Sequence, residues 1–284
     1  MKFDLHCHSH FSDGNHPPEF LIQRAIANNV THLAITDHDC VQVFKQPVEV
    51  PQELTLIPGV EISCTWNGQE IHVVGLGIDV EAQQLTAILD IQQKSRRERA
   101  ATMAKRLASF TDYDLESYLE SLPCISRTRS HIANFLVKEG ASKNHQQAFK
   151  KYLSRKGKLY CPANWCDLET AISSINAAGG IAVVAHPSRY PFTRKKLLSL
   201  LSDFKQAGGA AIETAYSNLD PLARKKLEDA CDEMDLYASC GSDFHSIENT
   251  WTDIGKFHSF AESKKNSIWN HPRWHFSHNS PQAV

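Results

Sequence analysis

Short apolar runs alternate with helical patterns along most of this chain, and that alternation limits its fold more than any other feature. Several runs have the length and composition of buried strands: 2–7, 32–36, 55–60, 71–77, 180–185, 210–214 and 237–241. Between them lie stretches with the spacing of helices: 18–28, 168–178, 193–207 and 221–234. Strands that alternate with helices form parallel βαβ units, so the sequence predicts an α/β fold with a parallel sheet or barrel.

The stretch 81–160 breaks this rhythm, because it reads as helices throughout. Its helical patterns cover 83–110, 114–121, 128–139 and 144–153. We therefore expect a helical insertion domain at 81–160 between two parts of a barrel, 1–80 and 161–284. The second part ends in a polar tail that we expect to pack against the barrel, with rings at Trp269, His271, Trp274, His275 and His278.

Composition places the chain among ordinary globular proteins. Its 284 residues suffice for about two domains or for one large α/β barrel. The fractions of 42% hydrophobic and 22% charged residues exclude disorder, collagen and coiled coil. A formal net charge of −2 excludes a blanket polybasic nucleic-acid binder, so any anion site must be local.

Cysteine usage and hydropathy indicate an intracellular protein. The eight cysteines are scattered without a CxxC pair, which favours buried reduced thiols over disulfides or a zinc finger. The N-terminus carries no apolar leader segment, and no run approaches the ~18 apolar residues of a membrane span. We therefore expect a cytoplasmic protein that has no contact with a membrane.

Imidazole and carboxylate side chains follow the predicted strands near their carboxyl ends. His6 and His8 are two residues apart and so face the same side of the first strand, and Asp243 and His245 repeat this spacing after the last. The other members of the set are Asp13, His38, Glu61, His72 and His186. In parallel α/β sheets and barrels, the carboxyl ends of the strands hold the active site.

A single histidine at a strand end is more often a capping or core residue than a metal ligand. Nine imidazoles and carboxylates that converge on one edge are different, because their burial together is costly unless cations hold them. We therefore expect a site for several metal ions. Nitrogen and oxygen ligands without sulfur suit Mn²⁺, Fe²⁺ or Zn²⁺.

The order of these residues along the chain, HxH, Asp, His, Glu, His, His-Pro, DxH, resembles the polymerase-and-histidinol-phosphatase (PHP) superfamily of metal-dependent phosphoesterases. The resemblance implies a distorted (β/α)₇ barrel and up to three divalent ions, Mn²⁺ first, with Zn²⁺ or Fe²⁺ as alternatives. It also implies three sets of ligands: His6, His8, Glu61 and Asp243; Glu61, His72 and His186; and Asp13, His38 and His245. Glu61 would bridge two ions.

Further motifs resemble one branch of that superfamily, the TrpH/YciV-like group. They are Glu61-Ile62-Ser63, Gly68-Gln69-Glu70-Ile71-His72, Ser130-His131-Ile132-Ala133, Ala178-Gly179-Gly180 and His186-Pro187-Ser188-Arg189-Tyr190. The branch contains nucleoside 3′,5′-bisphosphate phosphatases and a 5′-to-3′ exoribonuclease, RNase AM, which implies a role in maturing the 5′ ends of ribosomal RNA. Two local departures are the stretch 40–44, where a Thr-x-x-Gly-like sequence is expected, and Ser130, where a proline is expected.

The insertion offers a second site, for a phosphate group of the substrate. Arg127, Arg129 and His131 precede or begin a predicted helix, and Arg189 lies three residues after His186. Arginine side chains and backbone N–H groups at such a place bind phosphate, although surface salt bridges would account for the same residues. A cluster of basic residues, Lys150, Lys151, Arg155, Lys156 and Lys158, is typical of a solvated face and would alternatively follow an RNA backbone.

Together these features predict one chemistry for both activities of the branch. A metal-bound hydroxide is the expected nucleophile, and His245 or His186 the candidate acid. The arginines and His131 would bind the 5′-phosphate of RNA, of a short oligonucleotide or of a nucleoside 3′,5′-bisphosphate, while the metals act on the phosphorus at the 3′ oxygen. No obligate protein partner is indicated. The alternatives are a small-molecule phosphatase of the histidinol-phosphatase type and a non-catalytic metal-binding module.

Overall fold

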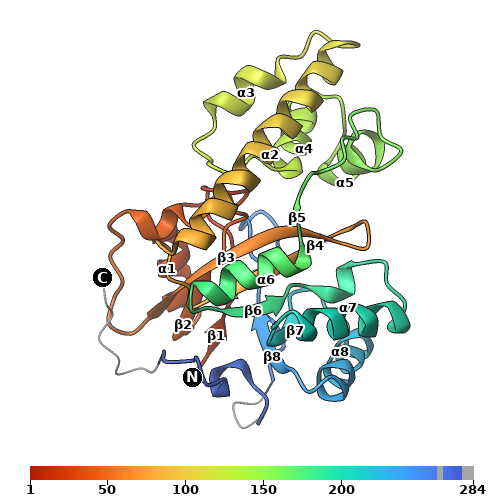
Figure 1. Cartoon of the computed structure of the whole chain (residues 1–284). Coiled ribbons are helices and arrows are strands. Elements are labelled where there is room, and N and C mark those ends of the chain that lie inside the picture. The colour runs from red at the N-terminus through yellow and green to blue at the C-terminus, as the bar shows by residue number, and fades with distance from the viewer. Residues whose placement is uncertain (261–264, 277–284) are drawn as a thin grey trace.

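The predicted strands form one sheet that curls almost into a closed barrel (Figure 1). The computed structural model describes residues 1–260 and 265–276. Along the sheet the strands follow the order β1 (Phe3–Asp4), β2 (His32–Ile35), β3 (Thr55–Trp66), β4 (Gln69–Leu76), β6 (Ile181–Val184), β7 (Ala211–Tyr216) and β8 (Tyr237–Gly241). A short strand, β5 (Cys166–Asp167), pairs with β3 off this path. The expected α/β barrel is confirmed.

One strand differs from the predicted parallel sheet. Strand β4 is antiparallel to both of its neighbours, β3 and β6, whereas the other pairs are parallel. The cause is a two-residue turn, Asn67-Gly68, with φ of 47° and 69°, since two positive φ values give the turn that joins antiparallel strands into a hairpin. The amino-terminal half of β4 therefore lies at the end of the barrel where the parallel strands finish.

The barrel closes between the first and the last strand. The N–H of Leu5 donates to the carbonyl of Cys240 at 3.0 Å, and the N–H of His8 donates to the carbonyl of Phe244 at 2.9 Å. Gly241 makes this approach feasible, because a Cβ atom there would lie 2.3 Å from the Cβ of His6. The segments that carry the pairs His6/His8 and Asp243/His245 thus lie side by side.

Helices cover the outside of the barrel at the places that the sequence predicts. They are α1 (Pro18–Ala27), α6 (Leu168–Ala177), α7 (Arg194–Gln206) and α8 (Pro221–Glu233), with single turns η1 (Gln42–Lys45), η3 (Pro187–Arg189) and η4 (Ile268–Asn270). Side chains of Asp167, Thr193 and Asp220 cap α6, α7 and α8 by accepting from backbone N–H groups. Within the described residues, none of the helices combines the length and the apolar character needed to cross a membrane.

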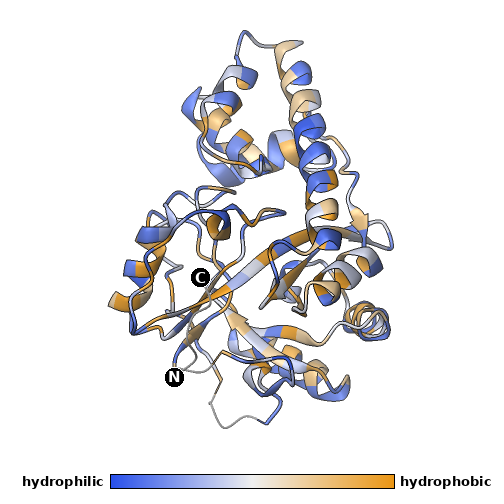
Figure 2. Ribbon diagram, turned by 60° about the vertical axis from the view of Figure 1, so that its left-hand side comes forward, coloured by the Kyte–Doolittle hydropathy of each residue, from blue (hydrophilic) through white to orange (hydrophobic). Residues whose placement is uncertain are grey.

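The stretch that reads as helical throughout folds as helices on one side of the barrel (Figure 1). It comprises α2 (Gln83–Ala108), α3 (Leu115–Ser121), α4 (Arg129–Lys138) and α5 (His145–Ala148), which continues into a π-helical turn, η2 (Phe149–Leu153). These helices share an apolar cluster of their own, which includes Met103, Leu107, Leu119, Phe135 and Leu136. Their ribbons alternate between hydrophilic and hydrophobic residues, as expected for helices with one buried face (Figure 2).

A buried ion pair ties the long helix α2 to the barrel. The guanidinium of Arg96, which is only 5% exposed, donates from Nε to Asp39 at 2.8 Å and from Nη2 to the hydroxyl of Ser63 at 2.8 Å. Beside it, Gln93 donates to the carbonyl of Asp39 at 2.8 Å. The loop that carries His38 and Asp39 is therefore held by the insertion.

Arg96→Leu should lower the free energy of unfolding by about 3–5 kcal/mol, because it leaves the buried carboxylate of Asp39 without its cation. Denaturant unfolding followed by circular dichroism measures this difference. Lys94→Leu, on the exposed side of the same helix, is the control and should change the free energy by no more than about 0.5 kcal/mol. Equal stability of the two variants would show that the pair does not anchor the helix.

The described part of the C-terminal tail packs against the barrel, as expected. The ring of Trp269 stacks on Phe3 with a centroid distance of 4.2 Å, and Trp274 meets the same ring edge-on at 6.1 Å. His271 contacts the ring of Tyr237. His278 lies outside the described residues.

Candidate active site

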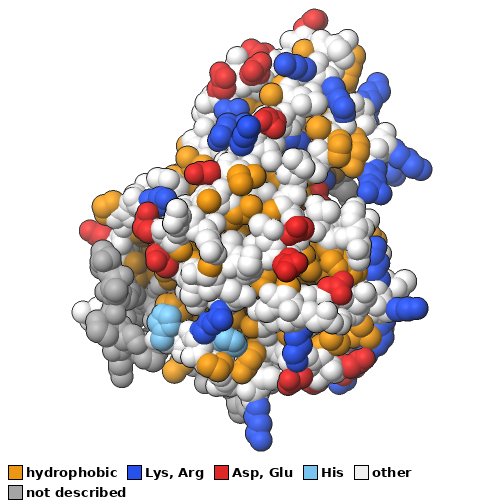
Figure 3. Space-filling model, viewed as in Figure 1, with side chains coloured by type: hydrophobic (Ala, Val, Ile, Leu, Met, Phe, Trp, Pro, Cys, Tyr) orange, Lys and Arg blue, Asp and Glu red, His pale blue; other side chains and the backbone are white. Residues whose placement is uncertain are grey.

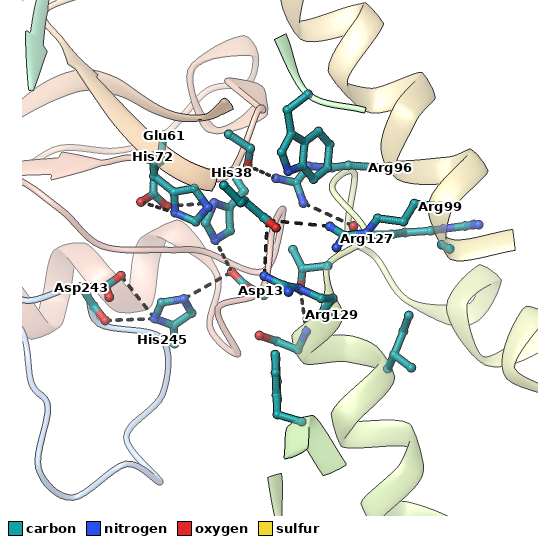
Figure 4. A pocket seen from close by; sticks show the side chains of 18 of the residues that line it. Asp13, His38, Glu61, His72, Arg96, Arg99, Arg127, Arg129, Asp243 and His245 are labelled. Carbon is teal, nitrogen blue, oxygen red and sulfur yellow. Dashed lines mark hydrogen bonds and ion pairs between the residues drawn. The ribbon is translucent and has the colours of Figure 1, made fainter. Parts of the chain in front are cut away.

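The nine imidazoles and carboxylates of the sequence come together at one end of the barrel. Figure 4 labels Asp13, His38, Glu61, His72, Asp243 and His245 among them. The carboxylate of Glu61 lies at their centre, within the long strand β3 rather than at its end. Five imidazole nitrogens lie within 3.4 Å of its oxygens, those of His6, His8, His38, His72 and His186. His72 reaches this point from the beginning of β4, because that strand is antiparallel.

Four groups of these side chains place ligand atoms within 4.8 Å of one another. The groups are His8, Asp13, His38 and His245; His6, Glu61 and His186; His6, His8 and Asp243; and His38, Glu61 and His72. The expected set of Asp13, His38 and His245 is thus brought together, with His8 added. Of the next expected set, His6, His8 and Asp243 form one group without Glu61. Glu61 instead groups with His6 and His186, and in a further group with His38 and His72.

The site has polar atoms that the described residues do not satisfy. Asp13 Oδ1 and His186 Nδ1 are buried without a hydrogen-bond partner in the part of the chain that the structure describes. Buried polar groups of this kind are rare in proteins unless an ion or a water molecule satisfies them. The donor set therefore fits divalent cations and can hold more than one.

The charges at the site agree with cation binding. Burial alone would raise the pKa of Glu61, but the neighbouring imidazoles of His72, His38 and His6 hold it well below its usual value. The pKa of Asp243 is also lowered, because the charges of Arg189, His245 and His6 outweigh its burial. Both carboxylates are therefore ionised at neutral pH, which is the form that binds metal ions.

Glu213 contacts two residues of the site, His6 and His186, and was not predicted from the sequence. Its carboxylate is buried; Oε1 lies 2.7 Å from His6 Nδ1, and Oε2 accepts from the backbone N–H of His186 at 2.6 Å. A histidine held through Nδ1 turns its Nε2 toward the centre, and here His6 Nε2 lies 3.1 Å from His8 Nε2. His186 also has a φ of 31°, a left-handed conformation that this contact helps to fix.

A cavity of about 400 Å³ joins this cluster to the insertion (Figure 4). Its wall on the insertion side carries Arg99, Arg127 and Arg129, which we call the arginine clamp. Figure 4 shows the clamp at one end of the cavity and Asp243 with His245 at the other. The lining is strongly charged, so the cavity suits a polar substrate with more than one anionic group.

The structure places the predicted phosphate-binding residues at three different positions. Arg127 and Arg129 line the cavity in the insertion, and Arg189 lines it at the metal end, where its guanidinium contacts the carboxylate of Asp243. His131 does not line it. Its Nδ1 accepts from the backbone N–H of Thr128 at 3.1 Å and so caps the start of α4.

Sequence reasoning missed several residues of the cavity wall. Arg99 lines it one turn of α2 beyond Arg96, and both guanidinium groups lie over the ring of Trp165, at 5.5 and 4.9 Å. Glu70 pairs with Arg129 at 3.3 Å and with Arg99 at 3.7 Å. The i, i+3 spacing of Arg96 and Arg99 on a predicted helix was the available signal.

The basic cluster of the insertion lies at the surface beside α5 (Figure 3). Lys150, Lys151, Lys156 and Lys158 are exposed and do not line the cavity. Arg155 belongs to an adjoining hollow, which also includes Arg99, Arg129 and Trp165. The solvated-face interpretation thus fits the four lysines.

Comparison with known proteins agrees with the family that the sequence motifs resemble. The family model of the PHP domain matches residues 4–160. A 5′-3′ exoribonuclease of Haemophilus influenzae is 40% identical and covers 90% of this chain and 93% of its own. A 3′,5′-nucleoside bisphosphate phosphatase of Chromobacterium violaceum is 38% identical and covers 89% and 90%.

The fold is likewise that of a solved relative. An amidohydrolase from Chromobacterium violaceum, solved with bound sulfate and no metal, is 35% identical, covers 92% of this chain and 93% of its own, and has a TM-score of 0.85. The expected fold, resemblance and chemical class, hydrolysis of phosphoester bonds, are confirmed by these relatives. This chain, with its nine imidazoles and carboxylates at one end of a barrel, belongs to the PHP family.

Proposed function

We propose that the protein is a metal-dependent phosphoesterase that cleaves the bond between phosphorus and the 3′ oxygen of 5′-phosphorylated nucleotides. The observation that carries this proposal is the single cavity that holds both the ligand cluster and the arginine clamp. The relatives named exoribonuclease and bisphosphate phosphatase support the same substrates. Maturation of ribosomal RNA at its 5′ end is the cellular role that we assign to the exoribonuclease activity.

We assign the metal-ligand role to the nine clustered residues, His6, His8, Asp13, His38, Glu61, His72, His186, Asp243 and His245. Divalent ions bound there would polarise the phosphoryl group and lower the pKa of a coordinated water. We propose Mn²⁺ as the ion, because a donor set that mixes carboxylates with imidazoles accepts it among other divalent ions. Glu213 orients His6 and His186 for this role.

The arginine clamp is proposed to bind the 5′-phosphate of the substrate. Guanidinium groups bind phosphate through pairs of parallel hydrogen bonds, and Arg127 and Arg129 stand at the start of α4, where the helix dipole also favours an anion. We assign residues 81–160 as the domain that carries this clamp. Arg189, which lines the cavity at the metal end, is proposed to bind the phosphoryl group under attack.

One geometry then accounts for two reactions. When the phosphorus at the 3′ oxygen is terminal, its hydrolysis turns a nucleoside 3′,5′-bisphosphate into a 5′-monophosphate and inorganic phosphate. When it links to a further nucleotide, the same cleavage releases a 5′-mononucleotide and leaves a new 5′-phosphate on the remaining RNA. Whichever of His245 and His186 is not fully engaged by a metal ion would supply the proton to the departing 3′ oxygen, since both line the cavity.

Arg129→Ala should raise KM for a 5′-phosphorylated RNA by about 10- to 100-fold, because a charge-assisted contact to phosphate is lost. The wild type should cleave the same RNA with a 5′-hydroxyl poorly, and the variant should lose little more on that substrate. Lys143→Ala, an exposed lysine of the insertion that does not line the cavity, is the matched control. Steady-state kinetics on the two RNAs measures the effect, and equal losses on both would contradict the clamp.

The same cavity distinguishes the alternatives. A small-molecule phosphatase of the histidinol-phosphatase type needs no second phosphate site, whereas this cavity carries the three arginines of the clamp at its insertion end. A non-catalytic module has no need of a substrate cavity between ligand cluster and clamp. Comparison of histidinol phosphate with adenosine 3′,5′-bisphosphate as substrates decides between the first alternative and the proposed function.

A further inference from the structure

A second cavity leaves the metal end of the site on the side away from the arginine clamp. It has a volume of about 400 Å³ and shares Arg189, Asp243 and His245 with the first cavity. Its lining includes no residue of the clamp. The rest of its wall comes from segments that follow His186, β7 and β8: Ser188, Tyr216, Ser217, Asn218, Asn249, Trp251 and Thr252.

A third cavity, of about 370 Å³, continues the second. The two share Tyr216, Ser217 and Asn218, and the third adds the basic side chains of Arg224 and Lys256, together with Leu219, Phe257 and His258. No carboxylate lines it in the described part of the chain. Arg224 pairs with Glu228 at 2.9 Å and Lys256 with Asp253 at 2.8 Å, so each cation is held in place while part of its charge is balanced.

Trp251 lines the second cavity, and its side chain is largely exposed to solvent. Its side chain is 65% exposed, and within residues 1–260 and 265–276 the structure gives it no ring contact or hydrogen bond. An exposed indole beside a polar cavity has the form of the aromatic platforms on which single-stranded nucleic acids stack their bases. Every base has a flat face, so such a platform accepts any sequence.

The position of the two cavities relative to the clamp gives the polarity of a bound strand. With the 5′-phosphate at the clamp and the phosphorus under attack at the ligand cluster, the rest of an RNA must continue beyond Asp243 and His245. That is where the second and third cavities lie. A nucleoside 3′,5′-bisphosphate ends at the ligand cluster and does not enter them.

We propose that these two cavities form a track for the RNA strand on the 3′ side of the cleaved bond, with Trp251 as a stacking platform for one of its bases. This inference rests on the proposed function and deepens it, since it separates the exoribonuclease reaction from the bisphosphatase reaction. Arg189 stands at the entrance of the track, and Arg224 with Lys256 lies farther along it, near the path of the backbone phosphates.

The test compares substrates of increasing length: adenosine 3′,5′-bisphosphate and 5′-phosphorylated oligoadenylates of two, three, five and ten nucleotides. In the wild type, KM should fall as nucleotides are added on the 3′ side. Trp251→Ala should lower the ratio of kcat/KM for the ten-nucleotide RNA to that for the bisphosphate by about 5- to 150-fold, the loss of one stacked base. Trp251→Phe, which keeps a ring, should restore most of the ratio.

Ile247→Ala is the matched control, because Ile247 is an apolar residue of the same loop, 48% exposed, that does not line the three cavities. It should leave the ratio unchanged. Unchanged kinetics of Trp251→Ala on the long RNA would overturn the track. Equal losses of Trp251→Ala on the bisphosphate and the RNA would also overturn it, since they would show a structural role for the loop.

Binding without cleavage keeps the inference separate from the proposed function. Fluorescence anisotropy of the ten-nucleotide RNA, labelled at its 3′ end and mixed with protein in EDTA, gives Kd for the wild type and Trp251→Ala. Weaker binding by the variant supports the track even if the wild type hydrolyses neither substrate, a result that would refute the proposed function alone. Equal Kd values would refute the track whatever the enzyme cleaves.

Discussion

Glu61→Gln should reduce kcat/KM for adenosine 3′,5′-bisphosphate by about 10³-fold or more. Substituting residues that merely orient a metal ligand costs about 10- to 100-fold, and Glu61 is itself the carboxylate around which five imidazoles converge. The amide keeps the volume of the side chain but removes the negative charge that holds cations there. Steady-state kinetics and metal analysis of the dialysed protein measure kcat/KM and the metal content per chain. Both values should fall.

The control for this substitution is Glu169→Gln, the same change at an exposed position of α6. It should leave activity and metal content as in the wild type. A Glu61→Gln enzyme that keeps its activity with a lowered metal content would show that an ion held by Glu61 serves only the structure. Retention of both would refute the assignment of Glu61 as a ligand.

Removal of divalent ions should abolish activity and lower the melting temperature. An ion at 100 times its Kd stabilises the folded protein by about 2.7 kcal/mol, which for a chain of this size corresponds to a shift of about 5–10 °C. The expected sequence of results is loss of activity after dialysis against EDTA, return of activity with Mn²⁺, and a parallel return of the melting temperature. Differential scanning fluorimetry and phosphate release measure the two quantities.

The Glu61→Gln variant serves as control for the stability measurement, because its melting temperature should respond much less to Mn²⁺. Full activity in protein that retains less than about one tenth of an ion per chain would refute metal dependence. Reactivation by Zn²⁺ or Fe²⁺ in place of Mn²⁺ would correct the identity of the ion and leave the site unchanged.

The part of the site that depends on strand geometry was accessible from the sequence. The pairs His6/His8 and Asp243/His245 lie two residues apart next to strand-like runs, and the alternation of side chains along a strand places each pair on one face. The barrel then brings these two segments together through main-chain hydrogen bonds between 5–8 and 240–244. Local periodicity and the rules of parallel sheets suffice for this step.

The parts of the site that depend on a turn, or on contacts between residues far apart in the chain, could not be predicted from the sequence in this way. His72 was expected at the end of a parallel strand, and it reaches the site because the Asn67-Gly68 turn reverses β4. Arg96 and Asp39 are 57 residues apart, and Glu213 and His6 are 207 apart, so nothing local reveals either pair. Such contacts follow from the packing of the whole chain.

His131 shows how one residue type serves two purposes. Its position after two arginines at a predicted helix start favoured phosphate binding, but its ring occupies the N3 position of a capping box, where glutamate or glutamine is usual. The residue therefore shapes the loop that presents Arg127 and Arg129. In the structure His131 takes part in this cap and does not line the cavity, while phosphate binding by Arg127 and Arg129 stays a prediction.

Helix α2 carries, on successive turns, the arginine that is fixed to the barrel and an arginine that faces the substrate. A helix keeps its rise of about 1.5 Å per residue, so the offset between Arg96 and Arg99 does not vary while the helix stays intact. If the clamp holds the terminal 5′-phosphate, this fixed offset sets the distance between that phosphate and the ligand cluster. The size of the released product would then be one nucleotide whatever the length of the RNA.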